Sequence, residues 1–426
     1  MAIVALSITP SPPPSLVCSS FAAIAPCSGQ LSCRRMRRSR GMRSFLQGVE
    51  PVLPGDQLRR KHCMVHTQTE SVVMSTEDLL QAQHELYHHA MAYVRSAALR
   101  AATDLRIPDA IHQHGGVATL SDIASETGIH PTKHSHLRRL MRALTTFGIF
   151  SVEGCDDGDA AGYKLTPVSR LLVEGGGENP CTQSPSVRVI VDPLSMTALC
   201  SIKEWFTEER ASAMTLFEVA HGCTRAEMRA KKGTGGLFDA GMVADSRPVM
   251  EAVLKEHIGV FQDVSTLIDA GGGHGGAAAA IAKALPHVKC TVLDLPDVVA
   301  GAPTGGNVHF VAGNLFEYVP PTDAVLLKWV MCLWQDEDAV KVLQRCREAI
   351  PAGGKVIIID AVLESGGSQN NVLLRETQAL FDVQMMRVDG GEREEHQWKK
   401  IFLEAGFRDY KIIPMSGFRS IIEVYP

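Results

Sequence analysis

The strongest constraint on the fold is an alternation of short β-rich runs with helical runs, which begins near Ser265 in this 426-residue chain. Helical segments separate five such runs, "TLIDA", "KCTVLDL", "VHFVAG", "DAVLLKW" and "KVIIIDAVL". Strands joined by helical crossovers form an open parallel sheet. Two final runs, "YKIIPMS" and "SIIEVYP", have no helix between them, so we expect an antiparallel hairpin at one edge. The pattern predicts an α/β fold with a Rossmann-like sheet of seven strands.

A glycine-rich loop, "AGGGHGG", follows the first predicted strand and precedes the helical run "AAAAIAKAL". Glycine allows a sharp turn and the close approach of a ligand, and the N–H groups at the start of a helix face that ligand. Glycines alone would also fit a dinucleotide. Asp269, however, stands immediately before the loop, where it would repel a pyrophosphate but not a cationic ligand.

The next two strand ends carry groups that suit a nucleoside. Asp294 in "LDLPD" is placed to accept hydrogen bonds from ribose hydroxyls. Asn314 and Leu315 in "AGNLF" offer an amide to the edge of an adenine and an apolar side chain to its face. With Gly271 in the loop, these strand ends predict a site for S-adenosyl-L-methionine. An NAD-dependent dehydrogenase is the more distant interpretation, which nucleotide binding would test.

The region that begins at Thr76 is helical and then reads as helix, turn, helix and a short strand pair in "TLSDIASETGIHPTKHSHLRRLMRALTTFGIF". A helix–turn–helix with a wing can bind DNA, but the same shape also serves for dimerisation. Residues 1–76 hold nine of the 42 basic and three of the 47 acidic residues, which leaves a net charge of −11 on the remainder. This acidic body gives no support to nucleic-acid binding.

Residues 1–76 do not have the pattern of a folded domain. Up to Gly48 they are rich in Ser, Pro and Arg and contain no acidic residue, which is the composition of an organelle transit peptide. A disordered tail is the equally weighted alternative. The 11 cysteines form no Cys-x-x-Cys pair, which suggests reduced thiols, and no apolar run reaches the roughly 20 residues that span a bilayer. We expect a cytoplasmic protein without membrane contact, or a chloroplast protein if the extension is a transit peptide.

From about Leu79 to Pro426 the chain resembles the plant small-molecule O-methyltransferases of the caffeate and flavonoid type, which need no metal. The shared motifs include "HLRRLMRAL", "YKLTPVSRLL", "LFDAGMVADSR", "LIDAGGGHGG", "GGKVIIID" and "RSIIEVYP". The composition predicts a disordered or targeting extension at 1–76, and the resemblance implies a winged-helix dimerisation domain at 77–185 and a methyltransferase domain at 186–426. It also implies a homodimer that acts on a small phenolic substrate.

The resemblance places the family's cofactor contacts on five residues of this chain, namely Gly271, Asp294, Asn314, Leu315 and Lys328. The family usually has Asp where Asn314 stands. The side-chain oxygen of an Asn can still accept a hydrogen bond from an adenine amino group. We therefore expect S-adenosyl-L-methionine to bind with somewhat reduced affinity at most.

The segment "KWVMCLWQD" departs from the family at its catalytic position. Cys332 stands where the family has the His that acts as general base, and Leu333 stands where it has Asp. The two acids that orient the base fall on Asp360, usually Glu in the family, and on Glu392. A thiol with a pKa of about 8.5 is mostly neutral at pH 7, and two carboxylates would raise that pKa further. Cys332 is therefore a poor substitute for the base.

Three consequences of this departure remain open. The protein could be a slow enzyme that works by proximity alone, or it could use an acceptor that needs no base, such as an acidic hydroxyl or an N or S nucleophile. It could also bind the cofactor without turnover and act as a dimer partner. We predict O-methyl transfer to a flavonoid or hydroxycinnamate-like phenol, with a catalytically impaired family member as the alternative.

Overall fold

The computed structural model describes residues 74–153, 161–175, 181–209, 214–233, 235–364 and 371–426. The extension predicted at 1–76 lies almost wholly outside these residues. From Val73 onward the chain forms one compact unit. None of its described helices is long and apolar enough to cross a bilayer.

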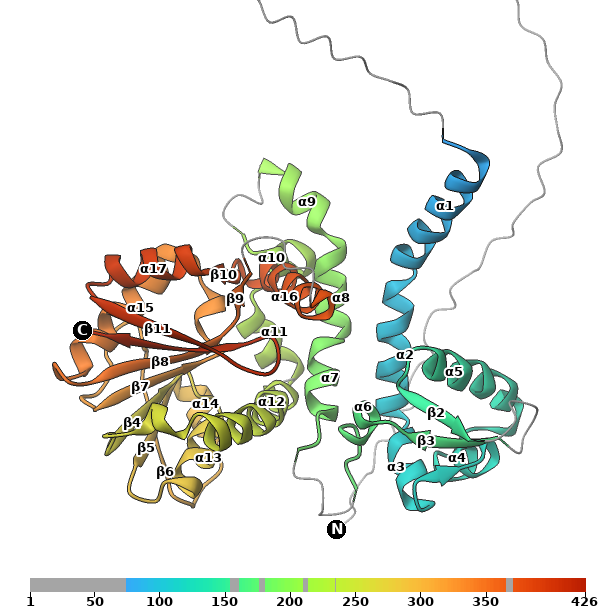
Figure 1. Cartoon of the computed structure of the whole chain (residues 1–426), viewed down its shortest axis with the longest axis horizontal. Helices are drawn as coiled ribbons and strands as arrows, with labels where there is room; N and C mark the ends of the chain where they lie inside the picture. Colours follow the sequence, from blue (N-terminus) through green and yellow to red (C-terminus); the bar gives the residue numbers. More distant parts are fainter. Residues whose placement is uncertain (1–73, 154–160, 176–180, 210–213, 234, 365–370) are drawn as a thin grey trace, which may run out of the picture. The chain divides into compact units, whose positions relative to one another are not determined.

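A seven-stranded sheet forms the centre of the C-terminal half, as predicted (Figure 1). Its order is β11-β12-β8-β7-β4-β5-β6. The five strands from β8 to β6 are parallel, β12 is antiparallel to β8, and β11 forms the edge hairpin with β12. The strands are β4 (Thr266–Ala270), β5 (Lys289–Asp294), β6 (Val308–Ala312), β7 (Ala324–Lys328), β8 (Lys355–Asp360), β11 (Asp409–Pro414) and β12 (Ser420–Tyr425).

Helices cover both faces of this sheet, which explains why its central strands are apolar without alternation. In β7 and β8 every residue except Lys328 and Lys355 is buried. On one face lie α12 (Gly235–Glu256) and α13 (Gly276–Ala284), and on the other lie α15 (Asp336–Ala349) and α17 (Glu395–Glu404) (Figure 1). Trp398 of α17 is fully buried in the hydrophobic core between the sheet and the face covered by α15 and α17.

The N-terminal region has the predicted helix–turn–helix with a strand pair. Ser75 caps the first helix reciprocally with Asp78. Pro131 begins a 3-10 turn before the second helix of the motif. The elements are α1 (Thr76–Ala90), α2 (Ala92–Asp104), α3 (Ile107–Gln113), β1 (Val117–Ala118), α4 (Leu120–Glu126), α5 (His134–Thr146), β2 (Phe150–Glu153) and β3 (Gly162–Leu165), with sheet order β1-β3-β2.

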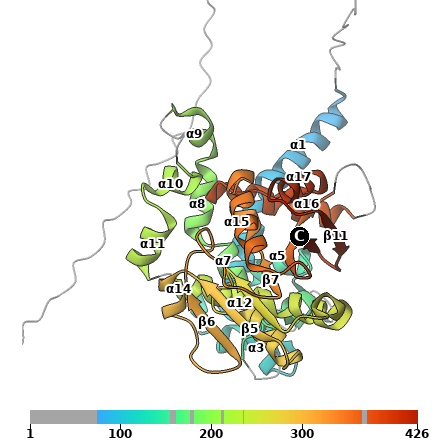
Figure 2. The same ribbon diagram turned by 90° about the vertical axis from the view of Figure 1, so that its left-hand side faces the viewer.

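Short helices connect this region to the large sheet. Of these, α8, α10 and α11 pack together through Ala198, Phe217 and Met228 (Figure 2). The connecting elements are α6 (Pro167–Arg170), α7 (Ser184–Ile190), α8 (Pro193–Cys200), α9 (Ile202–Thr207), α10 (Leu216–His221) and α11 (Arg225–Lys232). Beyond β4 the remaining elements are α14 (Pro296–Ala300), η4 (Met331–Leu333), β9 (Val362–Leu363), α16 (Val372–Met385), η5 (Met386–Val388) and β10 (Arg393–Glu394).

Candidate functional site

The five residues predicted to contact a cofactor all line one cavity of about 400 Å³. The cavity lies at the carboxyl ends of the parallel strands, where open α/β sheets bind ligands. Gly271 follows β4, Asp294 ends β5, and Lys328 ends β7. Asn314 and Leu315 come just after β6. Parallel strands in register bring these four strand ends to one edge, so residues far apart in the sequence meet there.

The glycine loop is shaped by positive φ angles and by the acid on the neighbouring strand. Gly271 and Gly273 have φ of 71° and 58°, in the left-handed region that favours glycine. One Asp294 oxygen accepts a hydrogen bond from the Gly273 N–H at 2.7 Å, and the other accepts from Leu295 at 2.7 Å. Asp294 therefore holds the loop as well as facing the cavity.

Asp269 lies directly behind the loop and is 1% exposed. A Cβ atom on Gly272 would lie 2.5 Å from the Asp269 carboxyl carbon, so only glycine fits there. Burial raises the pKa of Asp269 to about 6, although the positive charge of Lys328 opposes this rise. A ligand that carries positive charge would favour the ionised carboxylate. The cavity thus suits the sulfonium and amino groups of S-adenosylmethionine.

Asn314 uses both ends of its side chain to order the turn after β6. Its oxygen accepts from the Phe316 N–H at 3.0 Å, and its nitrogen donates to Glu317 at 3.1 Å. An amide oxygen has two lone pairs, so one remains for an adenine amino group. Leu315 packs towards Gly271 and lines the cavity beside Asn314. The adenine contact assigned to this pair stays a prediction.

Lys328 has a carboxylate partner, shared with an arginine, that its sequence position did not indicate. Its Nζ donates to Asp245 of α12 at 2.7 Å, and Arg419, just before β12, donates to the other Asp245 oxygen at 2.9 Å. Burial lowers the pKa of Lys328, while Asp245 raises it. The lysine therefore anchors the end of β7 to α12 in addition to lining the cavity.

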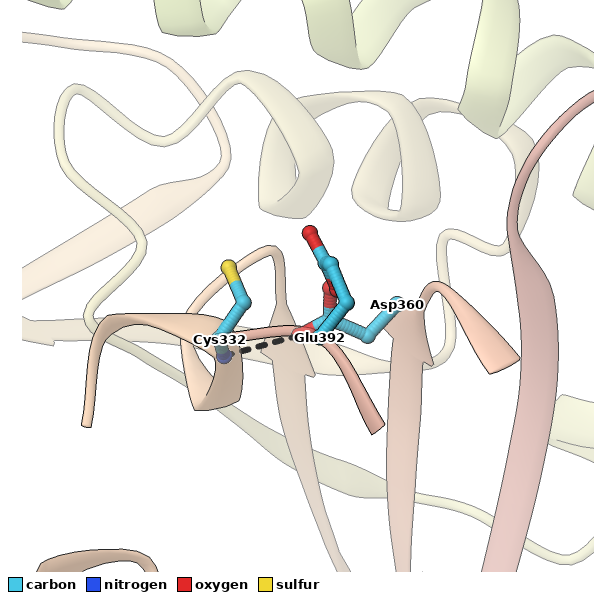
Figure 3. Close-up of side chains that lie close together, drawn as sticks. All are labelled: Cys332, Asp360 and Glu392. Atoms are coloured by element: carbon cyan, nitrogen blue, oxygen red, sulfur yellow. Dashed lines mark hydrogen bonds between the residues drawn. The ribbon is translucent and has the colours of Figure 1, made fainter. Parts of the chain in front are cut away.

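Cys332, Asp360 and Glu392 come together as the resemblance implied (Figure 3). The Cys332 thiol and one oxygen of each carboxyl group lie within 4.8 Å of one another. The backbone N–H of Cys332 donates to Asp360 at 3.3 Å, and its carbonyl accepts from Gly391 at 2.9 Å. The three residues that the resemblance assigned to the base position and its flanking acids thus lie together, and their catalytic roles stay predictions.

Burial sets the charge of this group. It raises the pKa of the Cys332 thiol well above its usual value, and the two neighbouring acids raise it further. Burial, followed by repulsion from Asp360, raises the pKa of Glu392 to about 9, and burial raises that of Asp360 to about 6. Neither Glu392 oxygen has a hydrogen-bond partner among the described residues. At neutral pH the thiol is neutral and the two acids share at least one proton.

This is the one group of three potential metal ligands that lie close together within the described ranges. Arg419 and Arg393 both act on the two carboxyl groups with positive charge. A cation would be repelled by these guanidinium groups, and a proton already satisfies part of the negative charge. We therefore interpret the group as a proton-holding site and not as a metal centre.

Leu333, and not Cys332, forms the cavity wall at this point. Cys332 is 1% exposed, whereas Leu333 lines both the first cavity and a second cavity of about 360 Å³. The two cavities share five lining residues, namely Arg229, Phe238, Leu295, Val298 and Leu333. The two cavities therefore lie next to each other, with Leu333 in the wall of each.

Glu392 is expected to make the protein less stable as the pH rises. Unfolded Glu has a pKa of about 4.3, so between that pH and about 9 the folded state keeps a proton that the unfolded state has lost. The free energy of unfolding then falls with pH, by at most about 1.4 kcal/mol per pH unit. Glu392→Gln removes this titration, so its urea-unfolding free energy should fall less between pH 6 and pH 8 than that of the wild type. The exposed Glu404→Gln variant serves as the control; equal pH slopes for wild type and Glu392→Gln would contradict the expected proton.

The sheet, the glycine loop after its first parallel strand and the acid that ends the next strand define an S-adenosylmethionine-dependent methyltransferase. Two family models match, an O-methyltransferase dimerisation domain over residues 87–175 and an O-methyltransferase domain over residues 200–408. The chain belongs to the plant O-methyltransferase family. The resemblance stated from the sequence is thus confirmed, and the helix–turn–helix region matches a dimerisation domain. The boundaries at 76 and 185 stay predictions.

Named relatives support this assignment over most of the chain. Acetylserotonin O-methyltransferase 1 of Oryza sativa subsp. japonica is 57% identical over 366 residues, which cover 85% of this chain and 99% of the relative. Acetylserotonin O-methyltransferase 3 of the same organism is 59% identical over 357 residues, which cover 83% and 96%. The solved structure of CalO1, a methyltransferase in calicheamicin biosynthesis in its SAH-bound form, has a TM-score of 0.69 at 26% identity and covers 83% of this chain and 99% of that one.

Proposed function

We propose that the protein methylates a hydroxyl group on a small phenolic molecule of the flavonoid or hydroxycinnamate type. The observation that carries this proposal is the pair of adjacent cavities, because one has the glycine loop and Asp294 and the other is lined by Leu333, the residue that follows Cys332. Two similar rice proteins are named for acetylserotonin, which adds that compound to the candidate acceptors.

S-adenosylmethionine supplies a methyl group on a positively charged sulfur when it is bound. Asp294 would accept hydrogen bonds from the ribose hydroxyls, and Asn314 with Leu315 would hold the adenine. Asp269 would favour the positive charge from behind the loop. Lys328, held by Asp245, would keep the end of β7 in place.

Removal of the proton from the acceptor hydroxyl is expected to be the slow step of the reaction. A phenol with a pKa of about 10 is roughly 0.1% ionised at pH 7, and the neutral thiol of Cys332 is a poor proton acceptor. The protein would then be a slow methyltransferase, or one that prefers an acceptor with an acidic hydroxyl. The buried, neutral state of Cys332 also favours the second candidate, an impaired family member that binds the cofactor or serves as a dimer partner.

We further propose a homodimer formed through the region 77–185. No residue of α1 is buried, and its apolar side chains Leu79, Leu80, Leu86 and Tyr87 are more than half exposed. A second copy would remove this apolar surface from water, which is the usual reason for such a patch.

The Asp294→Ala variant tests the cofactor site and is expected to weaken S-adenosylhomocysteine binding about 10- to 100-fold. Each hydrogen bond to a charged group is worth roughly 1.5–3 kcal/mol, and the variant loses those to the loop as well as those to the ribose. Binding would be measured by calorimetry on the full chain, with exposed Glu404→Ala as the control. Unchanged affinity in Asp294→Ala would contradict the assigned site.

Methyl transfer from labelled S-adenosylmethionine to a panel of phenols, acetylserotonin included, would then test turnover. Transfer to at least one phenol supports the proposed enzyme. Cofactor binding without transfer to any of them supports the impaired alternative.

A further inference from the structure

The second cavity has an unusual wall for a pocket that would hold a neutral phenol. Much of its wall is apolar, because Phe217, Met228, Leu237 and Phe238 all line it. Arg225 at the start of α11 and Arg387 on η5 also line it, although they come from opposite ends of the methyltransferase region. The cavity therefore combines an apolar slot with two guanidinium groups.

Arg387 is held in place by neutral groups. Its Nε donates to the Gln384 carbonyl at 2.9 Å, and one terminal nitrogen donates to the Ser195 hydroxyl at 2.6 Å. A guanidinium has five N–H donors, so these two bonds fix its orientation and leave donors free. Within the described part of the chain, no carboxylate forms an ion pair with Arg387.

Arg225 also has no ion pair among the described residues, and its guanidinium stands over the Phe238 ring at 5.3 Å. The third arginine of the cavity differs, because Arg229 is paired with Asp239 at 2.8 Å. Two acids share the cavity wall: Asp192 attracts both Arg225 and Arg387 from a distance, and Asp297 is exposed at the start of α14. One partly buried carboxylate thus faces two partly buried guanidinium groups.

The pKa shifts of the two arginines agree with this excess of positive charge. Burial, and then repulsion from Arg225, lowers the pKa of Arg387 to about 10. Burial and repulsion from Arg229 lower that of Arg225. Both groups stay charged at neutral pH, and an anion between them would relieve the repulsion.

We propose that the acceptor is an aromatic acid, whose carboxylate is bound by Arg225 and Arg387 while its ring lies against the apolar side chains of the second cavity. Its hydroxyl end would point to Leu333, where the two cavities meet. Arginine suits this role because its planar fork matches a carboxylate. This inference rests on the proposed function and narrows it, since it favours phenolic acids over neutral phenols and over acetylserotonin.

The test compares acids with their methyl esters, which differ little in shape but lack the charge. Calorimetry on the full chain would first measure S-adenosylhomocysteine alone. With that compound bound, it would then measure hydroxybenzoate, hydroxycinnamate and hydroxyindole acids, each beside its ester. We expect at least one acid to bind 10-fold or more tightly than its ester. Arg387→Met and Arg225→Met should each remove most of this preference and change ester affinity less than threefold.

Two further variants serve as controls for the shape of the guanidinium group and for the loss of an arginine elsewhere. Arg387→Lys retains a charge but not the fork, so it should keep part of the preference. Arg345→Met, on α15 and outside both cavities, should keep all of it. Three results would overturn the inference: equal binding of acids and esters, no binding of either, or a preference that survives both Met variants. In each case, S-adenosylhomocysteine binding would leave the proposed function standing. Loss of S-adenosylhomocysteine binding itself would overturn both.

Discussion

The double variant Cys332→His, Leu333→Asp is expected to raise the rate of methyl transfer to ordinary phenols about 10²- to 10⁴-fold, which is the usual contribution of a general base. The surroundings already suit an imidazole. Asp360 holds the backbone at this position, and both Glu392 oxygens are buried without a partner among the described residues. A histidine could donate one ring N–H to Glu392 and accept the acceptor's proton on the other nitrogen.

The measurement is the rate of labelled methyl transfer by the wild type, the double variant and Cys332→Ala. Because the wild-type thiol is neutral, Cys332→Ala should be about as slow as the wild type. The wild type should also favour phenols of low pKa more strongly than the double variant does. Thermal unfolding of all three proteins would show that the larger side chain is tolerated. A wild type that already matches the double variant would mean that the reaction needs no histidine.

Most of the large sheet could be predicted from the sequence. Strands such as β4 and β8 are short apolar runs that follow helical segments, and this pattern is typical of a buried parallel strand. Gly271 and Asp294 could be assigned to one cavity for a related reason. Each lies at the carboxyl end of a parallel strand, and the register of a parallel sheet brings such ends together.

Residues that act across the fold could not be predicted in this way. Asp245 lies in the middle of α12, where a single acid usually faces solvent, and only the packing of α12 against the end of β7 brings it to Lys328. Arg225 and Arg387 meet one cavity from α11 and η5, and no spacing in the sequence relates them. The depth of Cys332 behind Leu333 likewise depends on packing that a linear pattern does not contain.

Asp245→Asn is expected to lower the free energy of unfolding by about 3–5 kcal/mol, the typical cost of removing one partner from a buried ion pair. Asp245 is the shared partner of two buried cations: the side chains of Lys328 and Arg419 are 6% and 5% exposed. Arg419 is further confined by the Trp329 ring, 4.1 Å from its guanidinium carbon. Without the carboxylate, two like charges would remain unpaired in a largely buried site.

Urea unfolding would measure this loss, with Asp338→Asn as a control that breaks the exposed pair with Lys341 and should leave stability nearly unchanged. The double variant Asp245→Asn with Lys328→Met separates charge from shape. It removes one of the two unpaired cations, so it should recover part of the stability that Asp245→Asn alone loses. If the second change only adds to the loss, then packing of the lysine chain, and not its charge, ties β7 to α12. A loss below about 1 kcal/mol in Asp245→Asn would mean that water enters the site and screens the two cations.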